Sequence, residues 1–152
     1  MAKHSLSASK LISSPAQRIY GLIADYHNGH PRILPKLYFV SLSVEQGGYG
    51  AGTIINFQMK VMGRIQSFHS AITEPQPGSI LVETDKYTGA VTTFTVDPRL
   101  NGQEAFVTIT TTTEVPDGLL GKVQGWLTTQ LLRPIYLKEL DQLAAVAKEQ
   151  IK

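Results

Sequence analysis

Residues 54–61 (IINFQMKV) alternate apolar and polar side chains, and this stretch decides the fold class. Side chains on a β-strand point alternately to the two faces of a sheet, so one face here is apolar and the other polar. The same period of two returns in further segments between residues 38 and 114, and glycine- and proline-rich turns separate these segments. The pattern predicts about six consecutive antiparallel strands joined by hairpins.

The segments before these strands carry different signals. Residues 4–11 predict a further strand. Ser14, directly before Pro15, predicts a capped helix start, and apolar residues at spacings of three and four continue the helix to Tyr26. Residues 31–35 have room for a single short helical turn between two prolines.

The last segment predicts one long helix from Leu119 to Gln150. Its apolar stripe changes direction near Pro134 by roughly a third of a turn at about 100° per residue. A kink at Pro134 would bring the two stripes into line, because proline removes one backbone donor.

Composition bounds the class of protein. The chain has 152 residues, 42% hydrophobic and 17% charged, and we expect a single domain over residues 1–152. A net charge of +2 gives little support for nucleic-acid binding, and the absence of cysteine excludes disulfides and thiolate chemistry. No apolar run approaches the ~20 residues of a membrane span, and the start lacks a signal-peptide pattern, so we expect no stable membrane insertion and a cytoplasmic location.

Several short motifs occur in an order that resembles a known family. They are a capped helix leading into an aspartate–aromatic pair and a proline-containing turn, a glycine-rich turn, a strand end, and a last hairpin. In this chain they lie at residues 14–20, 23–26, 31–35, 47–52, 71–75, 94–98 and 101–102. Their order and spacing resemble the START-like (SRPBCC) superfamily, which includes polyketide cyclase/dehydrase-like proteins and the major birch pollen allergen.

This resemblance implies a helix-grip fold of the α+β class. In that fold a curved antiparallel sheet of about seven strands wraps around a long C-terminal helix, and two short helices follow the first strand. The resemblance also implies a cavity between sheet and helix that holds an apolar or amphipathic ligand. Alternation along the strands does not separate a cavity from a filled core, since both need the same pattern.

We place candidate binding residues on the apolar phases of the strands and the long helix. The predicted cavity wall consists of Ile55, Phe57, Met59, Phe68, Val82, Phe94, Trp126 and Leu127. Tyr26, Ile33 and Leu37 are predicted to lie at the mouth, and Arg133 is a candidate anchor for an acidic ligand group. The alternative for Arg133 is an ordinary surface position.

The charged and polar residues allow two interpretations. His27 and His30 lie three apart, but no third ligand accompanies them, so we expect no metal and no cofactor. A solvated helix end is the alternative for this pair. Glu83 and Asp85 should be solvated on the outer face, because burying an unpaired charge is costly. Thr110 and Thr112 could offer hydrogen bonds to a cavity, although threonine there also suits a strand.

The leading hypothesis is binding of a hydrophobic or amphipathic small molecule, such as a lipid, polyketide, isoprenoid or aromatic metabolite. A polyketide cyclase/aromatase-like enzyme using the same cavity is the alternative, with Tyr26, His27, His30 or Arg133 as its polar groups, although no convincing acid–base pair stands out. A protein-interaction module is a third, less supported reading. We expect a monomer or weak homodimer.

Overall fold

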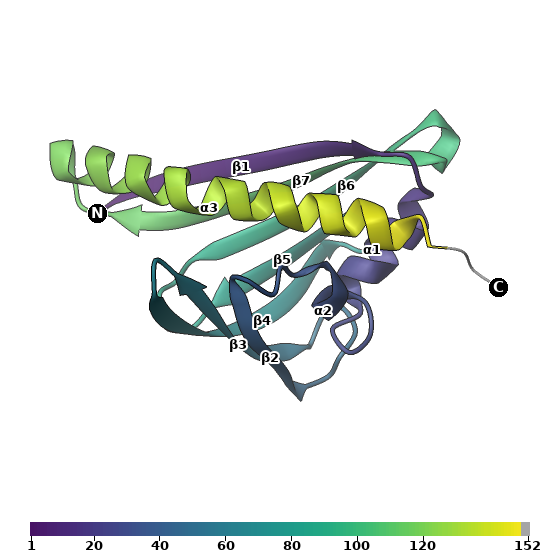
Figure 1. Ribbon diagram of the computed structural model, residues 1–152, viewed down its shortest axis with the longest axis horizontal. Coiled ribbons are helices and arrows are strands. Elements are labelled where there is room, and N and C mark those ends of the chain that lie inside the picture. The colour runs from purple at the N-terminus through teal and green to yellow at the C-terminus, as the bar shows by residue number, and fades with distance from the viewer. Residues whose placement is uncertain (150–152) are drawn as a thin grey trace.

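The computed structural model describes residues 1–149, which form one sheet and three α-helices (Figure 1). The strands are β1 (Ala2–Ile12), β2 (Phe39–Gln46), β3 (Ile54–Val61), β4 (Arg64–Gln76), β5 (Ile80–Asp85), β6 (Val91–Arg99) and β7 (Glu104–Val115). The helices are α1 (Ala16–Ala24), α2 (His30–Ile33) and α3 (Gly118–Ala147), with a short 3-10 turn at Leu100–Gly102. The predicted helix-grip fold of the α+β class is confirmed.

The seven strands form one antiparallel sheet in the order β1-β7-β6-β5-β4-β3-β2. Strands that follow one another in the chain are therefore neighbours, except β1, which pairs with β7. Figure 1 shows the sheet curving around α3, which runs beside β1 and β7 and reaches α1 and α2 at its C-terminal end. The helix thus lies between the two ends of the curved sheet.

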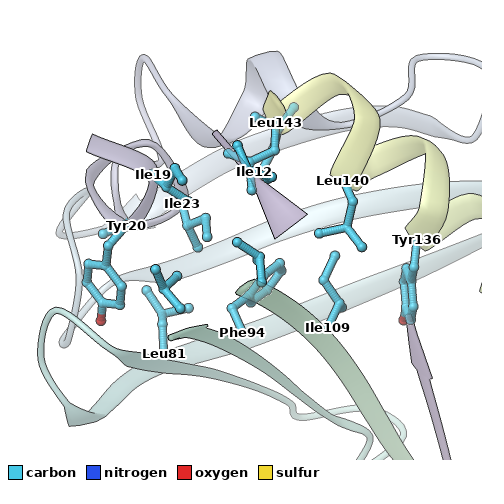
Figure 2. Close-up of a cluster of buried hydrophobic side chains, with 14 of the residues drawn as sticks. Ile12, Ile19, Tyr20, Ile23, Leu81, Phe94, Ile109, Tyr136, Leu140 and Leu143 are labelled. Atoms are coloured by element: carbon cyan, nitrogen blue, oxygen red, sulfur yellow. The ribbon is translucent and has the colours of Figure 1, made fainter. Parts of the chain in front are cut away.

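The hydrophobic core occupies only one half of the groove under α3. Figure 2 shows Leu140 and Leu143 of α3 packed toward Ile12, Phe94 and Ile109 of the sheet. Ile19 and Ile23 of α1 close this core at the far side, and Tyr136 of α3 stands at its opposite end. The core therefore ends near Tyr136, and it does not extend under the first half of α3.

The start of α1 differs from the prediction. Pro15 is the N-cap residue, with an extended backbone (ψ 133°), and no side chain caps the helix. The predicted cap at Ser14 is therefore wrong: an extended Pro15 moves the first helical residue to Ala16, too far along the chain for the Ser14 hydroxyl.

The face of α3 that touches the sheet is built differently in its two halves. After Pro134 most of the buried positions carry large side chains, such as Tyr136, Leu140 and Leu143, whereas before it the buried positions of α3 are Gly121 and Gly125. The apolar residues that form the first stripe of the sequence, from Leu119 to Leu127, are exposed. α3 is one continuous helix from Gly118 to Ala147 (Figure 1). Its inward line runs through Gly121 and Gly125 before Pro134, and a search for apolar residues misses these glycines.

Gly125 sets the distance between α3 and β1. A β-carbon at this position would lie 2.5 Å from Nδ1 of His4, whose Nε2 lies 2.7 Å from the hydroxyl of Thr129. The imidazole of β1 therefore occupies the space that any larger residue at position 125 would need.

Replacing Gly125 with Ala should lower the free energy of unfolding by about 1–3 kcal/mol, because the methyl group overlaps the His4 ring. Helix propensity alone predicts the opposite sign, a gain of up to about 1 kcal/mol. Urea denaturation of G125A, of the exposed control Q124A and of the double variant H4A/G125A measures the effect. If replacing His4 with Ala does not relieve the destabilisation of G125A, the His4 contact is not its cause.

Candidate functional site

A cavity of about 510 Å³, which we call the main cavity, lies between the first half of α3 and the sheet. Its apolar wall comes from the hairpin of β3 and β4, through Phe57, Met59 and Phe68. The facing wall is rich in hydroxyl groups, with Thr92, Thr111, Thr113 and Thr128 from β6, β7 and α3. The cavity therefore offers one apolar side and one side able to form hydrogen bonds.

The main cavity reaches the surface between the tip of the β3–β4 hairpin and α3. Met62 and Arg64 on the hairpin and Leu131 on the helix all line the cavity and are exposed. A ligand could enter here without crossing the hydrophobic core.

A smaller space of about 40 Å³, which we call the inner pocket, lies next to the main cavity. The two spaces share lining residues, among them Glu83, Thr92 and Tyr136. The inner pocket is also lined by His30 and Glu139, whose side chains are buried. We define Tyr26, His30, Glu83 and Glu139 as the inner cluster.

Two short segments place Tyr26 and His30. The Tyr26 amide donates to the carbonyl of Gly48 (2.9 Å), which ties the end of α1 to the β2–β3 loop. Asp25 turns the chain next, since its side chain accepts from the amides of His27 and Asn28 and its carbonyl accepts from the amide of His30. The result is a stack of the Tyr26 and His30 rings with centroids 4.5 Å apart.

Glu83 is the acceptor at the centre of the inner cluster. The Tyr26 hydroxyl donates to Glu83 Oε2 at 2.6 Å, and burial followed by the charge of Glu83 raises the pKa of Tyr26. His30 Nε2 lies 3.7 Å from the same oxygen. Tyr26 therefore remains protonated and supplies the hydrogen bond that Glu83 accepts.

His30 is a neutral imidazole with a defined tautomer. Its Nδ1 lies 2.7 Å from the carbonyl of Ile23, which can only accept, so Nδ1 carries the proton. Complete burial lowers the pKa of His30, and Glu83 opposes this effect only in part. Nε2 is therefore an unprotonated acceptor facing Glu83, and the pair is no salt bridge at neutral pH.

Glu139 is the unusual member of the inner cluster. Its side chain comes from the second half of α3, the residue is 2% exposed, and its Oε2 has no hydrogen-bond partner among residues 1–149. Burial, and next the charge of Glu83, raises the pKa of Glu139 well above its ordinary value. A buried carboxyl with a free oxygen is costly for folding alone, which marks this position as a candidate for function.

A chain of hydroxyls connects the two spaces. The hydroxyls of Thr92 and Thr111 lie 2.8 Å apart, and that of Thr111 lies 2.6 Å from the hydroxyl of Tyr136. Burial raises the pKa of Tyr136 to about 12, although the bond to Thr111 lowers it. Tyr136 is thus a neutral group that lines both the main cavity and the inner pocket.

Asp85, the other buried acid of β5, has a structural role. Its carboxylate accepts from the amide of His69 and from both the amide and the hydroxyl of Thr88. These bonds hold the β5–β6 turn, so the Asp85 carboxylate has its partners within the fold, whereas Glu139 Oε2 has none in the described part of the chain.

Five of the predicted wall residues lie around the two spaces. Phe57 and Met59 line both, Phe68 lines the main cavity, and Ile55 and Phe94 line the inner pocket. Their role in binding a ligand stays a prediction.

The other predicted positions lie elsewhere. Trp126 and Leu127 are 60% and 49% exposed, because the first half of α3 turns its glycines inward. Arg133 is exposed and lines neither space, so its surface interpretation fits the structure. Thr110 and Thr112 point outward and pair with Ser7 and Ser5 of β1, while Thr111 and Thr113 face the cavity.

The predicted mouth is also misplaced. Tyr26 and Ile33 are fully buried in the core, and Leu37 is 72% exposed and lines neither space. The short α1–α2 region packs against the second half of α3, at the closed end of the groove. A solvated helix end, the alternative given for His27 and His30, is wrong for His30, because its side chain is buried.

The predicted inner and outer faces of β5 are wrong, because the structure exchanges them. Leu81, Glu83 and Asp85 are buried, and Val82 is half-buried on the other face. The prediction placed Val82 inward because burying a charge is costly. Here hydrogen bonds offset that cost: Glu83 accepts from the Tyr26 hydroxyl, and Asp85 accepts from the β5–β6 turn. A usable signal existed in the hairpin, since Phe94 lies opposite Leu81 and Thr92 opposite Glu83, and opposed residues share a face.

Within residues 1–149, no group of three or more histidine, aspartate or glutamate side chains is arranged to hold a metal ion. No helix in the same range has both the length and the apolar character to cross a membrane.

A family model described as polyketide cyclase/dehydrase and lipid transport matches residues 3–148. No curated protein sequence matches. Among solved structures, the KanY protein is similar over 98% of this chain and 100% of its own, with 23% identity and a TM-score of 0.83.

Two further structures have the same fold. The Zhui aromatase/cyclase from Streptomyces sp. R1128 is 15% identical over 99% of this chain and 97% of its own, with a TM-score of 0.74. A START superfamily protein from Mycobacterium smegmatis is 15% identical over 95% of this chain and 97% of its own, with a TM-score of 0.73. At these identities the likeness concerns the fold alone.

Replacing Glu139 with Leu should raise the free energy of unfolding at neutral pH by about 1–3 kcal/mol, because it removes a buried oxygen without a partner. The raised pKa means that the folded state holds a proton that the unfolded chain releases above its ordinary value of 4.5. The wild type therefore loses stability relative to E139L as pH rises from that value toward the raised pKa.

Urea titrations of both proteins between acidic and neutral pH measure this difference. The groups that face Glu139, namely Glu83, Tyr26, His30 and Tyr136, are present in both. E139Q is the matched control, since it removes the titration and keeps a polar group. A difference that stays constant with pH would contradict the raised pKa.

Proposed function

The chain belongs to the polyketide cyclase/dehydrase and lipid transport family of the START-like superfamily, and from this premise we propose that its main cavity binds an apolar or amphipathic small molecule. The observation that carries the proposal is the cavity of about 510 Å³ beside a densely packed core. This volume falls within the ~300–1,000 Å³ of ordinary small-molecule sites.

The wall chemistry supports a ligand with a large apolar body. Phe57 and Phe68, whose rings stack on each other with centroids 4.8 Å apart, give the cavity an aromatic wall, and the flexible Met59 also lines it and adapts to different shapes. Each Å² of apolar ligand surface removed from water contributes about 25 cal/mol before the entropic cost of binding. The threonines of the opposite wall suit a few polar substituents on the same molecule.

A second candidate is a cyclase- or aromatase-like reaction in the same cavity. The feature that favours it is the inner cluster together with Tyr136, which places protonated oxygen groups beside an apolar cavity. Enolising and closing a poly-β-ketone needs a proton donor and a fixed folded pose. Incubation with such a substrate distinguishes the candidates. An enzyme cyclises it faster than it cyclises in buffer alone, whereas a binding protein leaves this rate unchanged.

Native mass spectrometry of the protein purified from its own host, followed by organic extraction, tests the binding proposal. We expect an added mass that denaturation releases as an organic-soluble compound. Failure to carry any such mass, together with failure to take up added apolar compounds, would contradict the proposal.

Replacing Thr113 with Phe should weaken binding of an apolar probe at least about tenfold, because the ring fills the main cavity from β7. T112F is the matched control, since Thr112 lies on the outer face beside Ser5. Isothermal titration of the same probe into both folded variants makes the comparison. Equal weakening by the two substitutions would show that the effect is not local to the cavity.

A further inference from the structure

We infer that the inner pocket recognises a neutral oxygen group, a hydroxyl above all, at one end of an otherwise apolar ligand, with Glu139 as the hydrogen-bond donor. This inference rests on the proposed function and adds to it the chemistry of the buried end of the ligand.

The size of the inner pocket limits what can enter. Its volume of about 40 Å³ exceeds the ~10–15 Å³ that a single water needs but is far smaller than a ring system. It shares Phe57, Met59, Glu83, Thr92 and Tyr136 with the main cavity, so a ligand body there can direct one substituent inward. The pocket therefore admits a functional group and leaves the apolar body outside.

Glu139 supplies the donor. Glu139 lines the inner pocket, and its Oε2 is buried and has no hydrogen-bond partner among residues 1–149. Because burial keeps the carboxyl protonated, it can donate one hydrogen bond to a ligand oxygen. No group among residues 1–149 accepts a hydrogen bond from Glu139 Oε2.

His30 and Glu83, which line the same pocket, supply the acceptors. His30 Nε2 is unprotonated, and Glu83 accepts from Tyr26 with Oε2 while a carboxylate can accept further bonds. A hydroxyl accepts from Glu139 and donates to one of these acceptors, whereas a ketone can only accept. The arrangement therefore favours an alcohol, phenol or enol over a ketone.

The charges exclude an inward-facing carboxylate. Glu83 and Glu139 line the inner pocket, and Asp85 lies beside the main cavity. Over residues 1–149, the cationic side chain lining either space is Arg64, which is exposed at the opening. A carboxylate at the inner end would thus be buried next to acids without a cation, and such burial is unfavourable.

A matched series of ligands tests the inference by isothermal titration at neutral pH. The probes share a naphthalene body and differ only in one substituent: β-naphthol, β-methylnaphthalene, β-naphthoate and the ammonium compound β-naphthylmethylamine. We expect β-naphthol to bind about tenfold more tightly than β-methylnaphthalene, and β-naphthoate more weakly than either.

Two variants locate the effect. E139L should weaken β-naphthol about tenfold and leave β-methylnaphthalene unchanged, because it removes only the donor. E139Q keeps an N–H donor and should retain most of the preference for β-naphthol. Melting curves of both variants without ligand establish that they are folded.

The outcomes separate this inference from the proposed function. If β-methylnaphthalene binds but β-naphthol has no advantage, or if E139L leaves the advantage intact, the inference is overturned and the binding proposal stands. Tighter binding of β-naphthoate or of the ammonium compound than of β-naphthol also overturns it, since the recognised group is then charged. If none of the four probes binds, the inference is overturned, and the proposed function is contradicted as well when native mass spectrometry also finds no bound compound.

Discussion

The packing of the second half of α3 into the concave face of the sheet is the interaction on which the rest of the structure depends. Leu140 and Leu143 are fully buried there, and the core around them holds α1, α2 and the central strands together. The first half of α3 is fixed instead by close contacts at two glycines: Gly121 lies against the backbone of Pro116, and Gly125 lies against the ring of His4. One helix thus closes the fold at one end and spans an unfilled space at the other.

The sequence revealed the periodic parts of this structure and missed the parts that depend on pairing between distant elements. Alternation in β3 correctly placed Phe57 and Met59 on the inner face, because neighbours along one strand determine that phase. The inward line of α3 could not be found by hydrophobicity, since glycines form it. The burial of Glu83 and His30 was not predicted for a related reason. Their hydrogen-bond partners, the Tyr26 hydroxyl and the Ile23 carbonyl, come from other elements, and only the fold shows that these partners are in reach.

The inner cluster is organised by differences in protonation rather than by opposite charges. Burial favours protonated Tyr26 and Glu139 and an unprotonated His30, so the cluster combines donors and acceptors without an ion pair. Asp85, on the same strand as Glu83, shows what a purely structural acid looks like in this fold, because its oxygens are used by the β5–β6 turn. The contrast explains why a buried acid alone is a weak sign of function, whereas a buried acid with an unused oxygen is a stronger one.

The pairing of β1 with β7 has a consequence for the order in which the chain can fold. Ala2 lies opposite Val115 and Ile12 opposite Ala105, so β1, which precedes the other strands of the sheet, has its partner far along the chain. Strands β2 to β6 can form hairpins with their neighbours while synthesis continues. β1 must wait as an unpaired amphipathic segment until β7 has been made, and such non-local closure is slow. β1 is therefore made before the other strands of this sheet and is paired among the last of them.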